Sequence, residues 1–280
     1  MKNLILLPCL LIGLFVTAQP STEVYLFDLD GDTANFSISN PVNISNNDGY
    51  DNQPSFWPNS KSVLYARTVK GQTEIARYFI DTKETKIVSK TKQGSEYSPT
   101  IMPDRRISSV RLDTTGLQLL YAYDLIGNVE VLVPEKVIGY HAWVGDMNIA
   151  AFVLGNPATL QIINTKTDES ETVYSKIGRS IHKVPNHPWF SFVDKSKDVW
   201  AVKAMDPSSK AVIYLTNTLE GAEDYCWTPE GSMVMGQGTK LFHWERDWSE
   251  FADLSEYGLG KISRVAVSRD GSKLVVVVDN

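Results

Sequence analysis

Cysteine is nearly absent from this sequence. Only Cys9 and Cys226 occur among 280 residues, and histidine is also scarce, with four. This scarcity excludes the disulfide framework that holds small secreted domains together. Cys226 lies between Tyr225 and Trp227, and we interpret it as a small buried hydrophobic residue rather than a nucleophile.

Positive charge is also in short supply. The chain has 27 Lys and Arg against 33 Asp and Glu, a formal net charge of −6, and no basic tail. We therefore expect no nucleic-acid partner and no adhesion to anionic lipid. The sequence also lacks a Gly-x-Ser-x-Gly elbow and a phosphate-cradling glycine loop after a strand. These absences favour a protein that is not an enzyme, and no catalytic residue is assigned.

Long hydrophobic runs are confined to the start of the chain. The run from Leu4 to Val16 follows a short basic start and leads to the small residues of Val16-Thr17-Ala18. It is shorter than the roughly 20 residues that span a bilayer. We predict a secretory signal peptide over residues 1–18, a single mature domain over residues 19–280, no membrane insertion after cleavage, and a periplasmic or secreted location. A lipoprotein is excluded because no small residue precedes Cys9 at the spacing that lipidation needs.

The chain contains a repeat instead. An Asn or Asp closes a short apolar strand six times, at Asp28, Asp81, Asp124, Asn164, Asp206 and Asp247, with steps of 40–43 residues from the second onward. A second marker precedes a hydrophobic run in phase with the first, at Pro58, Pro103, Val144, Pro185, Pro229 and Arg269. A period of about 40–45 residues with several short strands per unit is typical of a β-propeller.

Each unit is expected to hold four strands with apolar and polar residues alternating. The innermost strand precedes the second marker and is predicted at Ser55–Trp57, Thr100–Met102, His141–Trp143, His182–Val184, Cys226–Thr228 and Val265–Val267. The repeated Asn and Asp residues are interpreted as turn formers, because such a side chain accepts a hydrogen bond from the backbone N–H two residues later.

The end of the chain indicates how the ring closes. After Gly271 there is room for only one more strand, so the last unit holds two inner strands. The missing outer pair fits Glu23–Asp28 and part of Phe36–Ile44. We predict an all-β, six-bladed propeller with four-stranded antiparallel blades, the last closed by N-terminal strands, which removes open sheet edges.

Three segments carry a resemblance to a known family. Gln53–Lys61, Tyr97–Asp104 and Ala266–Lys273 resemble the Pro-x-apolar-Ser-Pro-Asp-Gly-Lys signature of WD-like propeller repeats, which occur in the C-terminal domain of TolB and in related bacterial envelope proteins. The third and fourth units keep only fragments, and we expect no separate N-terminal α/β domain of the kind that TolB has. The resemblance implies a stand-alone TolB-like propeller and, by analogy, a role in envelope protein contacts.

Propellers bind ligands at one end of the central channel, so the segments entering the innermost strands supply the candidate site. The candidates are Asp51, Glu96, Tyr97, Tyr140, His141, His182, Asp224, Tyr225 and Arg264. Tyrosine recurs before the innermost strand in four of the six units, at Tyr50, Tyr97, Tyr140 and Tyr225. A ring of tyrosines among charged residues suits peptide or glycan recognition. The alternative is that these rings wedge adjacent blades apart and are buried.

A metal site is a further possibility. The repeat aligns His141 and His182 at the same position of neighbouring blades, where Asp224 or Glu96 would complete a His/carboxylate site for zinc or calcium. The alternative is that both are polar loop residues at a solvated rim, and no tight ligand spacing supports a metal. No cofactor is therefore assigned. Asp28-Leu29-Asp30-Gly31-Asp32 is interpreted as a hairpin turn, since it lacks the glutamate of a calcium loop.

Three functional hypotheses follow. The leading one is a monomeric, non-enzymatic binding or scaffold propeller that contacts an envelope or secreted protein or peptide at the channel mouth, with a glycan as another possible ligand. The second is a metal-dependent propeller hydrolase or lyase, lactonase-like or sugar-active, with its site in the central channel. The third is an architectural domain that spaces other subunits.

Overall fold

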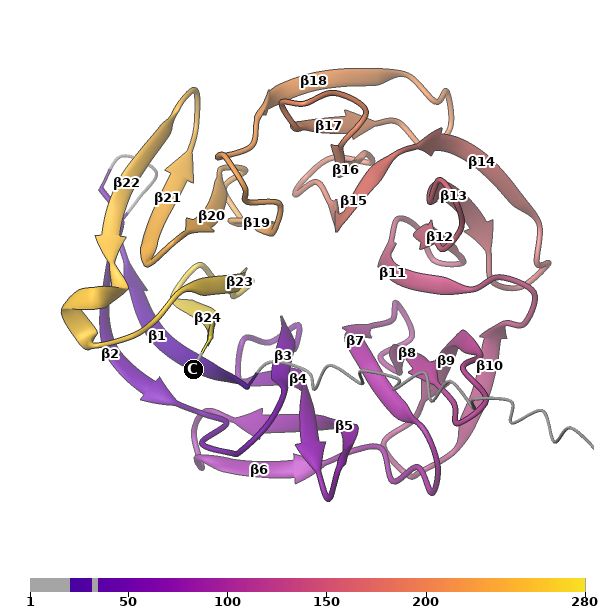
Figure 1. Ribbon diagram of the computed structural model, residues 1–280, viewed down its shortest axis with the longest axis horizontal. Helices are drawn as coiled ribbons and strands as arrows, with labels where there is room; N and C mark the ends of the chain where they lie inside the picture. Colours follow the sequence, from indigo (N-terminus) through magenta and orange to yellow (C-terminus); the bar gives the residue numbers. More distant parts are fainter. Residues whose placement is uncertain (1–20, 32–34, 280) are drawn as a thin grey trace, which may run out of the picture.

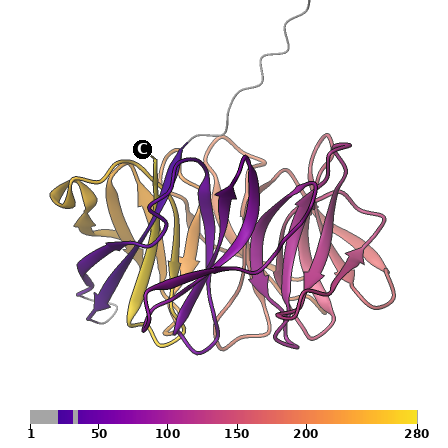
Figure 2. The ribbon, with the colours of Figure 1, turned by 90° about the horizontal axis from the view of Figure 1, so that it is seen from below.

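Six four-stranded antiparallel sheets form a ring around a central channel in the computed structural model, which describes residues 21–31 and 35–279 (Figure 1). Viewed from the side, the ring is a disc, with the strands nearest the channel running along its axis (Figure 2). The predicted all-β six-bladed propeller is confirmed, and every innermost strand lies at the channel.

Five blades each take four consecutive strands, with the innermost strand first. Blade 1 holds β3 (Asp51–Phe56), β4 (Ser62–Val69), β5 (Gln72–Phe79) and β6 (Glu84–Ile87), and blade 2 holds β7 (Ser95–Ile101), β8 (Ile107–Leu112), β9 (Gln118–Tyr123) and β10 (Val129–Val133). Blade 3 holds β11 (Ile138–Trp143), β12 (Asn148–Val153), β13 (Thr159–Asn164) and β14 (Ser170–Ser175). Blade 4 holds β15 (Ile177–Lys183), β16 (Phe190–Asp194), β17 (Ala201–Met205) and β18 (Val212–Asn217), and blade 5 holds β19 (Tyr225–Trp227), β20 (Met233–Gln237), β21 (Lys240–Trp244) and β22 (Trp248–Asp253).

Blade 6 joins the two ends of the chain. After a short 3₁₀ helix, η1 (Leu254–Tyr257), its order from the channel outward is β23 (Ile262–Val267), β24 (Lys273–Asp279), β1 (Thr22–Asp30) and β2 (Ser37–Asn43). β1 and β24 pair antiparallel without interruption from Thr22 opposite Asp279 to Asp28 opposite Lys273. The side chains of Asp28 and Lys273 also form an ion pair. The predicted closure by N-terminal strands is confirmed.

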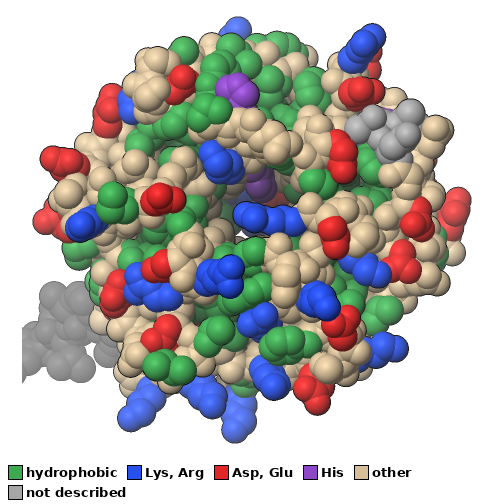
Figure 3. Space-filling view, turned by 180° about the vertical axis from the view of Figure 1, so that it is seen from behind, with side chains coloured by type: hydrophobic (Ala, Val, Ile, Leu, Met, Phe, Trp, Pro, Cys, Tyr) green, Lys and Arg blue, Asp and Glu red, His purple; other side chains and the backbone are tan. Residues whose placement is uncertain are grey.

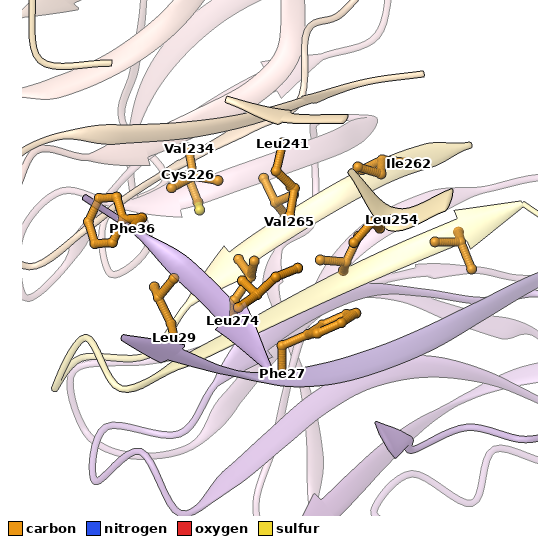
Figure 4. Close-up of a cluster of buried hydrophobic side chains, with 13 residues drawn as sticks. Phe27, Leu29, Phe36, Cys226, Val234, Leu241, Leu254, Ile262, Val265 and Leu274 are labelled. Carbon is orange, nitrogen blue, oxygen red and sulfur yellow. The ribbon is translucent and has the colours of Figure 1, made fainter. Parts of the chain in front are cut away.

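The hydrophobic core lies between neighbouring blades. The second strand of a blade is covered on both faces, which explains the unbroken apolar run of β24 and the complete burial of β16. Edge strands such as β6 and β14 carry charged, exposed residues, which discourages pairing with other chains. Figure 4 shows the cluster at the closure, where Phe27 and Leu29 from the N-terminal strand pack with Leu274 and with Cys226 of blade 5.

The innermost strands begin earlier than the sequence indicates. Candidate residues that we assigned to loops, such as Tyr97, Tyr140 and Arg264, lie inside strands β7, β11 and β23, and this part of the prediction is wrong. These segments have irregular register with the second strand, and Gln53 and Ser98 adopt positive φ. Such bulges interrupt the alternation of side chains, so a bulged strand looks like a loop in the sequence.

The turn chemistry of the repeat is confirmed in three units. Asp124, Asn164 and Asp206 each accept a hydrogen bond from the backbone N–H two residues later. Asp28 is different, because its carboxylate binds Lys273 and accepts from the Asn40 side chain instead. The expectation that every repeated Asn or Asp forms this side-chain hydrogen bond in its turn is therefore wrong as a general rule.

Two further predictions concern the start of the chain. The predicted signal peptide lies outside the residues that the structure describes, so it stays a prediction, as does Asp32 at the end of the Asp28–Asp32 turn. Within residues 21–31 and 35–279, no helix has the length and apolar character needed to cross a bilayer.

Candidate functional site

The central channel is a cavity of about 710 Å³ lined by the innermost strands. Its charged lining residues are Arg179, Lys183, Arg264 and Arg269, with Asp224 as the acidic member. Figure 3 shows the hollow at the centre of one face, with Lys and Arg side chains at its rim and a histidine inside it. The channel is thus electropositive in a chain of net charge −6, and field lines concentrate in such a cleft.

Asp224 organises the charges in the channel. Its carboxylate lies immediately before β19, where the Oδ1 atom accepts from Nη1 of Arg264 at 2.9 Å and Oδ2 accepts from Nε of Arg179 at 3.0 Å. Burial by itself raises the pKa of Asp224, but Arg264 and Arg179 outweigh burial and lower the pKa below its usual value. Asp224 is therefore ionised and holds two guanidinium groups in fixed positions.

Tyr140 extends this arrangement to blade 3. The guanidinium carbon of Arg264 lies 5.3 Å from the centre of the Tyr140 ring, and Nη2 of Arg264 donates to the Tyr140 hydroxyl at 3.4 Å. The ring of Phe152 packs against the same tyrosine ring in a T-shaped arrangement, with the two ring centres 5.9 Å apart. We call Tyr140, Arg179, Asp224 and Arg264 the channel charge cluster. Its members come from β11, β15, the residue before β19, and β23, which belong to blades 3, 4, 5 and 6.

The backbone at Arg179 is also held in place. Glu223 accepts from the backbone N–H of Arg179 at 3.1 Å and pairs with Lys195 at 2.9 Å. Gly178 makes this approach possible, because a Cβ atom there would lie 2.5 Å from the Glu223 carboxylate and 3.0 Å from Val193. Arg179 was not assigned by the sequence, although it lies in the same entering segment as His182.

His141 is a buried member of the channel wall. Its Nε2 atom lies 2.7 Å from the hydroxyl of Ser108 in β8 of blade 2, and the same hydroxyl accepts from Nε1 of Trp143 at 2.9 Å. The side chain is almost fully buried, and burial lowers the pKa of His141 to about 4. The imidazole is therefore neutral at physiological pH.

Tyr225 repeats this contact two blades further on. Its hydroxyl donates to Ser191 of blade 4 at 2.6 Å, and Nε1 of Trp227 donates to the same serine at 2.8 Å. Only 1% of Tyr225 is exposed. For this residue the alternative interpretation, a ring wedged between adjacent blades, is correct.

We expected His141 and His182 to occupy the same position in neighbouring blades, and this expectation is wrong because the alignment was shifted by one residue. The residue pair next to the hairpin is Trp143 with Ile149 in blade 3 and Lys183 with Phe190 in blade 4. Counting back from these pairs makes Ile181 the counterpart of His141. Because neighbouring residues of a strand face opposite sides, the two imidazoles point away from each other.

His182 has its own partners on the other side. Its Nε2 atom lies 2.8 Å from the Ser180 hydroxyl, and its ring packs against Tyr225 of the next blade at 4.8 Å. Burial lowers the pKa of His182 to about 4 as well. The misalignment of the two histidines arose at Val144. Val144 donates the backbone hydrogen bond that closes the hairpin, as Val184 does in blade 4, whereas the marker Pro185 is one residue further along.

Asp51 and Glu96 lie between blades and do not line the channel. Burial raises the pKa of each carboxyl to about 6. Each faces an acidic residue on the third strand of the preceding blade, and one loop residue contacts both members of the pair. Asn47 donates its backbone N–H to Glu23 at 3.1 Å and its side chain to Asp51 at 2.9 Å.

The second carboxyl pair copies the first at the next blade boundary. Thr91 donates its backbone N–H to Glu74 at 3.4 Å and its hydroxyl to Glu96 at 2.5 Å. The register repeats as well, since Asp51 lies opposite Arg67 and Glu96 lies opposite Arg111. The sequence does not reveal this arrangement, because the partners of each acid come from distant strands.

Tyr50 and Tyr97 contact each other at the boundary between blades 1 and 2. Their ring centres lie 6.1 Å apart in an edge-to-face arrangement, and both rings are half-buried. Burial raises the pKa of Tyr50 to about 12. Tyr140 and Tyr225 are the two of these tyrosines that line the cavity, whereas the Tyr50 hydroxyl lies near enough to feel the charges of Arg264 and Arg179. Tyr140 is the tyrosine whose hydroxyl and ring contact Arg264.

The donor groups near the two histidines do not fit a metal centre. In the part of the chain that the structure describes, no group of three or more His, Cys, Asp or Glu side chains converges. The Nε2 atoms of His141 and His182 are each engaged by a serine hydroxyl. Zinc and calcium sites need more convergent ligands than this arrangement supplies. His187 and His243 pack against aromatic rings, as expected for structural residues.

No protein-family model and no curated protein matches the chain. A candidate TolB from Agrobacterium tumefaciens superimposes with a TM-score of 0.73 over 94% of this chain and 99% of that chain, at 11% sequence identity. TolB from Acinetobacter baumannii has a TM-score of 0.58 over 91% of this chain and 64% of that chain, at 12% identity. An oligogalacturonate lyase in complex with manganese has a TM-score of 0.59 over 88% and 83%, at 13% identity. The similarity is one of fold, and the fold is common to TolB and to enzymes.

Proposed function

We propose that this protein is a non-enzymatic binding propeller that holds a protein or peptide partner at the mouth of its central channel. The observation that carries the proposal is the channel charge cluster. Asp224 fixes Arg179 and Arg264 with hydrogen bonds before any ligand arrives, at an end of the channel where four blades meet. Side chains that are already positioned lose little conformational freedom on binding, which favours recognition.

The proposed partner is an envelope or secreted protein. Two observations support this choice: the apolar run before Ala18, which is typical of a secretory signal peptide, and the likeness of the fold to TolB. The proposed location is the periplasm or the extracellular space, with the protein acting as a monomer.

A pull-down from an envelope extract tests the proposal. The full chain serves as bait, beside Tyr140→Ala, Arg264→Ala and Tyr97→Ala variants. Arg246→Gln is the matched control, because Arg246 lies in the exposed turn between β21 and β22, outside the channel lining. We expect a partner that the wild type and Arg246→Gln retain and that Tyr140→Ala and Arg264→Ala lose. The absence of any retained partner, or retention by all variants, would contradict the proposal.

A metal-dependent hydrolase or lyase is the second candidate. The likeness to the manganese-bound lyase favours it, whereas the separation of His141 from His182 counts against it. Metal analysis of the purified chain distinguishes the two. Stoichiometric zinc, calcium or manganese that disappears in His141→Ala or His182→Ala would replace the binding proposal with the enzyme.

A further inference from the structure

The charges of the channel are unbalanced. Arg179 and Arg264 share the single carboxylate of Asp224, so the cluster carries one uncompensated positive charge. Glu223 does not remove this excess, because its carboxylate pairs both with Arg179 at 3.6 Å and with Lys195 at 2.9 Å. Three cations then face two carboxylates, and one positive charge remains uncompensated. Lys183 and Arg269 add positive charge nearer the hairpin turns, where both side chains are exposed. A partly buried cation without an anion is unfavourable, and a bound carboxylate would correct the imbalance.

The two guanidinium groups also keep free hydrogen-bond donors. A guanidinium has five N–H groups. Arg264 uses one on Asp224 and one on Tyr140, and Arg179 uses two on Asp224. The side chains are 15% and 37% exposed, so their remaining N–H groups are accessible from the channel. Arginine binds carboxylates through such paired donors.

We propose that the ligand of this channel is an acidic peptide segment, whose carboxylate binds Arg179 and Arg264 beside Asp224. This inference rests on the proposed function and names the chemistry of the partner. The carboxylate of the ligand would be a C-terminal group or the side chain of Asp or Glu.

The channel wall favours a peptide over an acidic sugar. Each innermost strand is an edge strand, so the backbone N–H and C=O groups on its channel side have no strand partner within the sheet. An extended peptide pairs with such groups through its own amides. A sugar would instead need an open aromatic face, and in the charge cluster the Tyr140 ring is already covered by Arg264 and contacted by Phe152.

A random octapeptide library with free C-termini, selected on the immobilised full chain, tests the inference. We expect the wild type and Arg246→Gln to enrich peptides rich in Asp and Glu. We expect Arg264→Gln and Arg179→Gln each to abolish that enrichment, and the best peptide to bind these two variants at least tenfold more weakly. Arg264→Lys keeps the charge but not the paired donors and should give an intermediate loss. The circular dichroism and melting temperature of every variant verify that it is folded.

Further arms separate the possible outcomes. The best peptide is resynthesised with Gln for Glu, Asn for Asp and an amidated C-terminus, and trigalacturonate is titrated alongside. Enrichment of neutral peptides that Tyr140→Ala abolishes would uphold a peptide-binding channel and overturn the carboxylate inference. Binding of trigalacturonate without any acidic peptide would overturn it in favour of a sugar. No enrichment at all would overturn it as well, and if the pull-down also retains no partner, the proposed function fails with it.

Discussion

The Nε2 atom of His141 lies 2.7 Å from the hydroxyl of Ser108, across the boundary between blades 2 and 3. Ser108 directs its own hydroxyl toward the carbonyl of Thr100 at 3.2 Å, so its oxygen is the acceptor for His141. Ser191 has the matching geometry, because it directs its hydroxyl toward the carbonyl of His182 and accepts from Tyr225. We infer that His141 carries its proton on Nε2 and donates it to Ser108. The Tyr225 hydroxyl donates to Ser191 at the equivalent position of blade 5.

The first prediction concerns these two serines. Ser108→Ala leaves the N–H groups of His141 and Trp143 without their acceptor, and Ser191→Ala does the same to Tyr225 and Trp227. A buried donor left unpaired costs about 1–3 kcal/mol, so each variant, which leaves two donors unpaired, should lose roughly 2–6 kcal/mol of the free energy of unfolding. Urea denaturation measures the loss.

Ser170→Ala is the control for this experiment, since Ser170 lies on the exposed edge strand β14. Its free energy of unfolding should match that of the wild type. Should Ser108→Ala prove as stable as Ser170→Ala, the serine contact would have no role in holding the blades together.

The second prediction concerns stability between pH 4 and pH 6. Burial raises the pKa of Asp51 and Glu96 to about 6, so the folded protein binds protons there that the unfolded chain does not. These two groups stabilise the fold as the pH falls. Burial lowers the pKa of His141 and His182 to about 4, so the unfolded chain binds more protons there, and these groups destabilise the fold as the pH falls. The two effects oppose each other, each on the order of 2 kcal/mol per group.

The double variant Asp51→Asn, Glu96→Gln exposes the effect of the histidines. Its side chains mimic the protonated acids, so it should be more stable than the wild type at pH 7 and lose that advantage as the pH falls to 4. Its own stability should fall steadily from pH 6.5 to 4, whereas the wild type should change little. Urea denaturation at four pH values measures both curves. Parallel curves for the two proteins would show that the carboxyl groups do not have the raised pKa.

The sequence predicted the architecture of this protein because the architecture depends on counting. The repeat sets the number of blades, and the short segment after Gly271 leaves two strands to be supplied by the N-terminus. The candidate site depends on the register of each innermost strand, because a shift of one residue moves a side chain to the opposite face of the sheet. Val144 stands at a hairpin that has no proline, and aligning it with Pro185 placed His141 and His182 on the same face when they lie on opposite ones.

Burial was the second feature that the sequence did not reveal. Charged residues at the start of a strand are usually exposed, yet Asp51 and Glu96 are fully buried because Glu23, Asn47 and Thr91 converge on them from other segments. Arg179 could have been found, since its segment enters an innermost strand as those of Tyr140 and Arg264 do. The sequence offered no reason to favour it over its neighbours, because its partner Asp224 belongs to another blade.

The third prediction compares two aspartates at the same position of the repeat. Asp124 accepts hydrogen bonds from the backbone N–H groups of Ile126 and Asn128, and these bonds lower its pKa even though burial opposes them. Asp247 is exposed in the turn between β21 and β22, and within the described residues its carboxylate accepts no backbone N–H. Asp124→Ala should therefore lower the urea midpoint measurably, whereas Asp247→Ala should leave it unchanged. Equal midpoints for the two variants would show that the Asx bond contributes nothing to the turn.

The fourth prediction concerns the closure of the ring. Phe27 of β1 is 1% exposed and belongs to the core cluster between blades 5 and 6, where its ring also contacts Tyr257, whereas Val42 of β2 is 39% exposed. Phe27→Ala should cost about 3–5 kcal/mol, as large truncations in a core do, and Val42→Ala should change stability by less than about 0.5 kcal/mol. Thermal and urea denaturation measure both variants.

Deletion of residues 23–44 is the stronger form of the same experiment. It removes all of β2 and all of β1 except Thr22, takes away buried side chains such as Val24, Leu26 and Phe27, and uncovers β24. Each fully buried side chain of this kind contributes about 1.5–3 kcal/mol, so the loss approaches the 5–15 kcal/mol that usually separates a folded domain from its unfolded chain. The truncated chain should unfold or aggregate through the free edge of β24. A truncated chain that melts at the temperature of the wild type would mean that five blades and two strands are stable without the N-terminal pair, and that closure by the two ends does not hold the ring together.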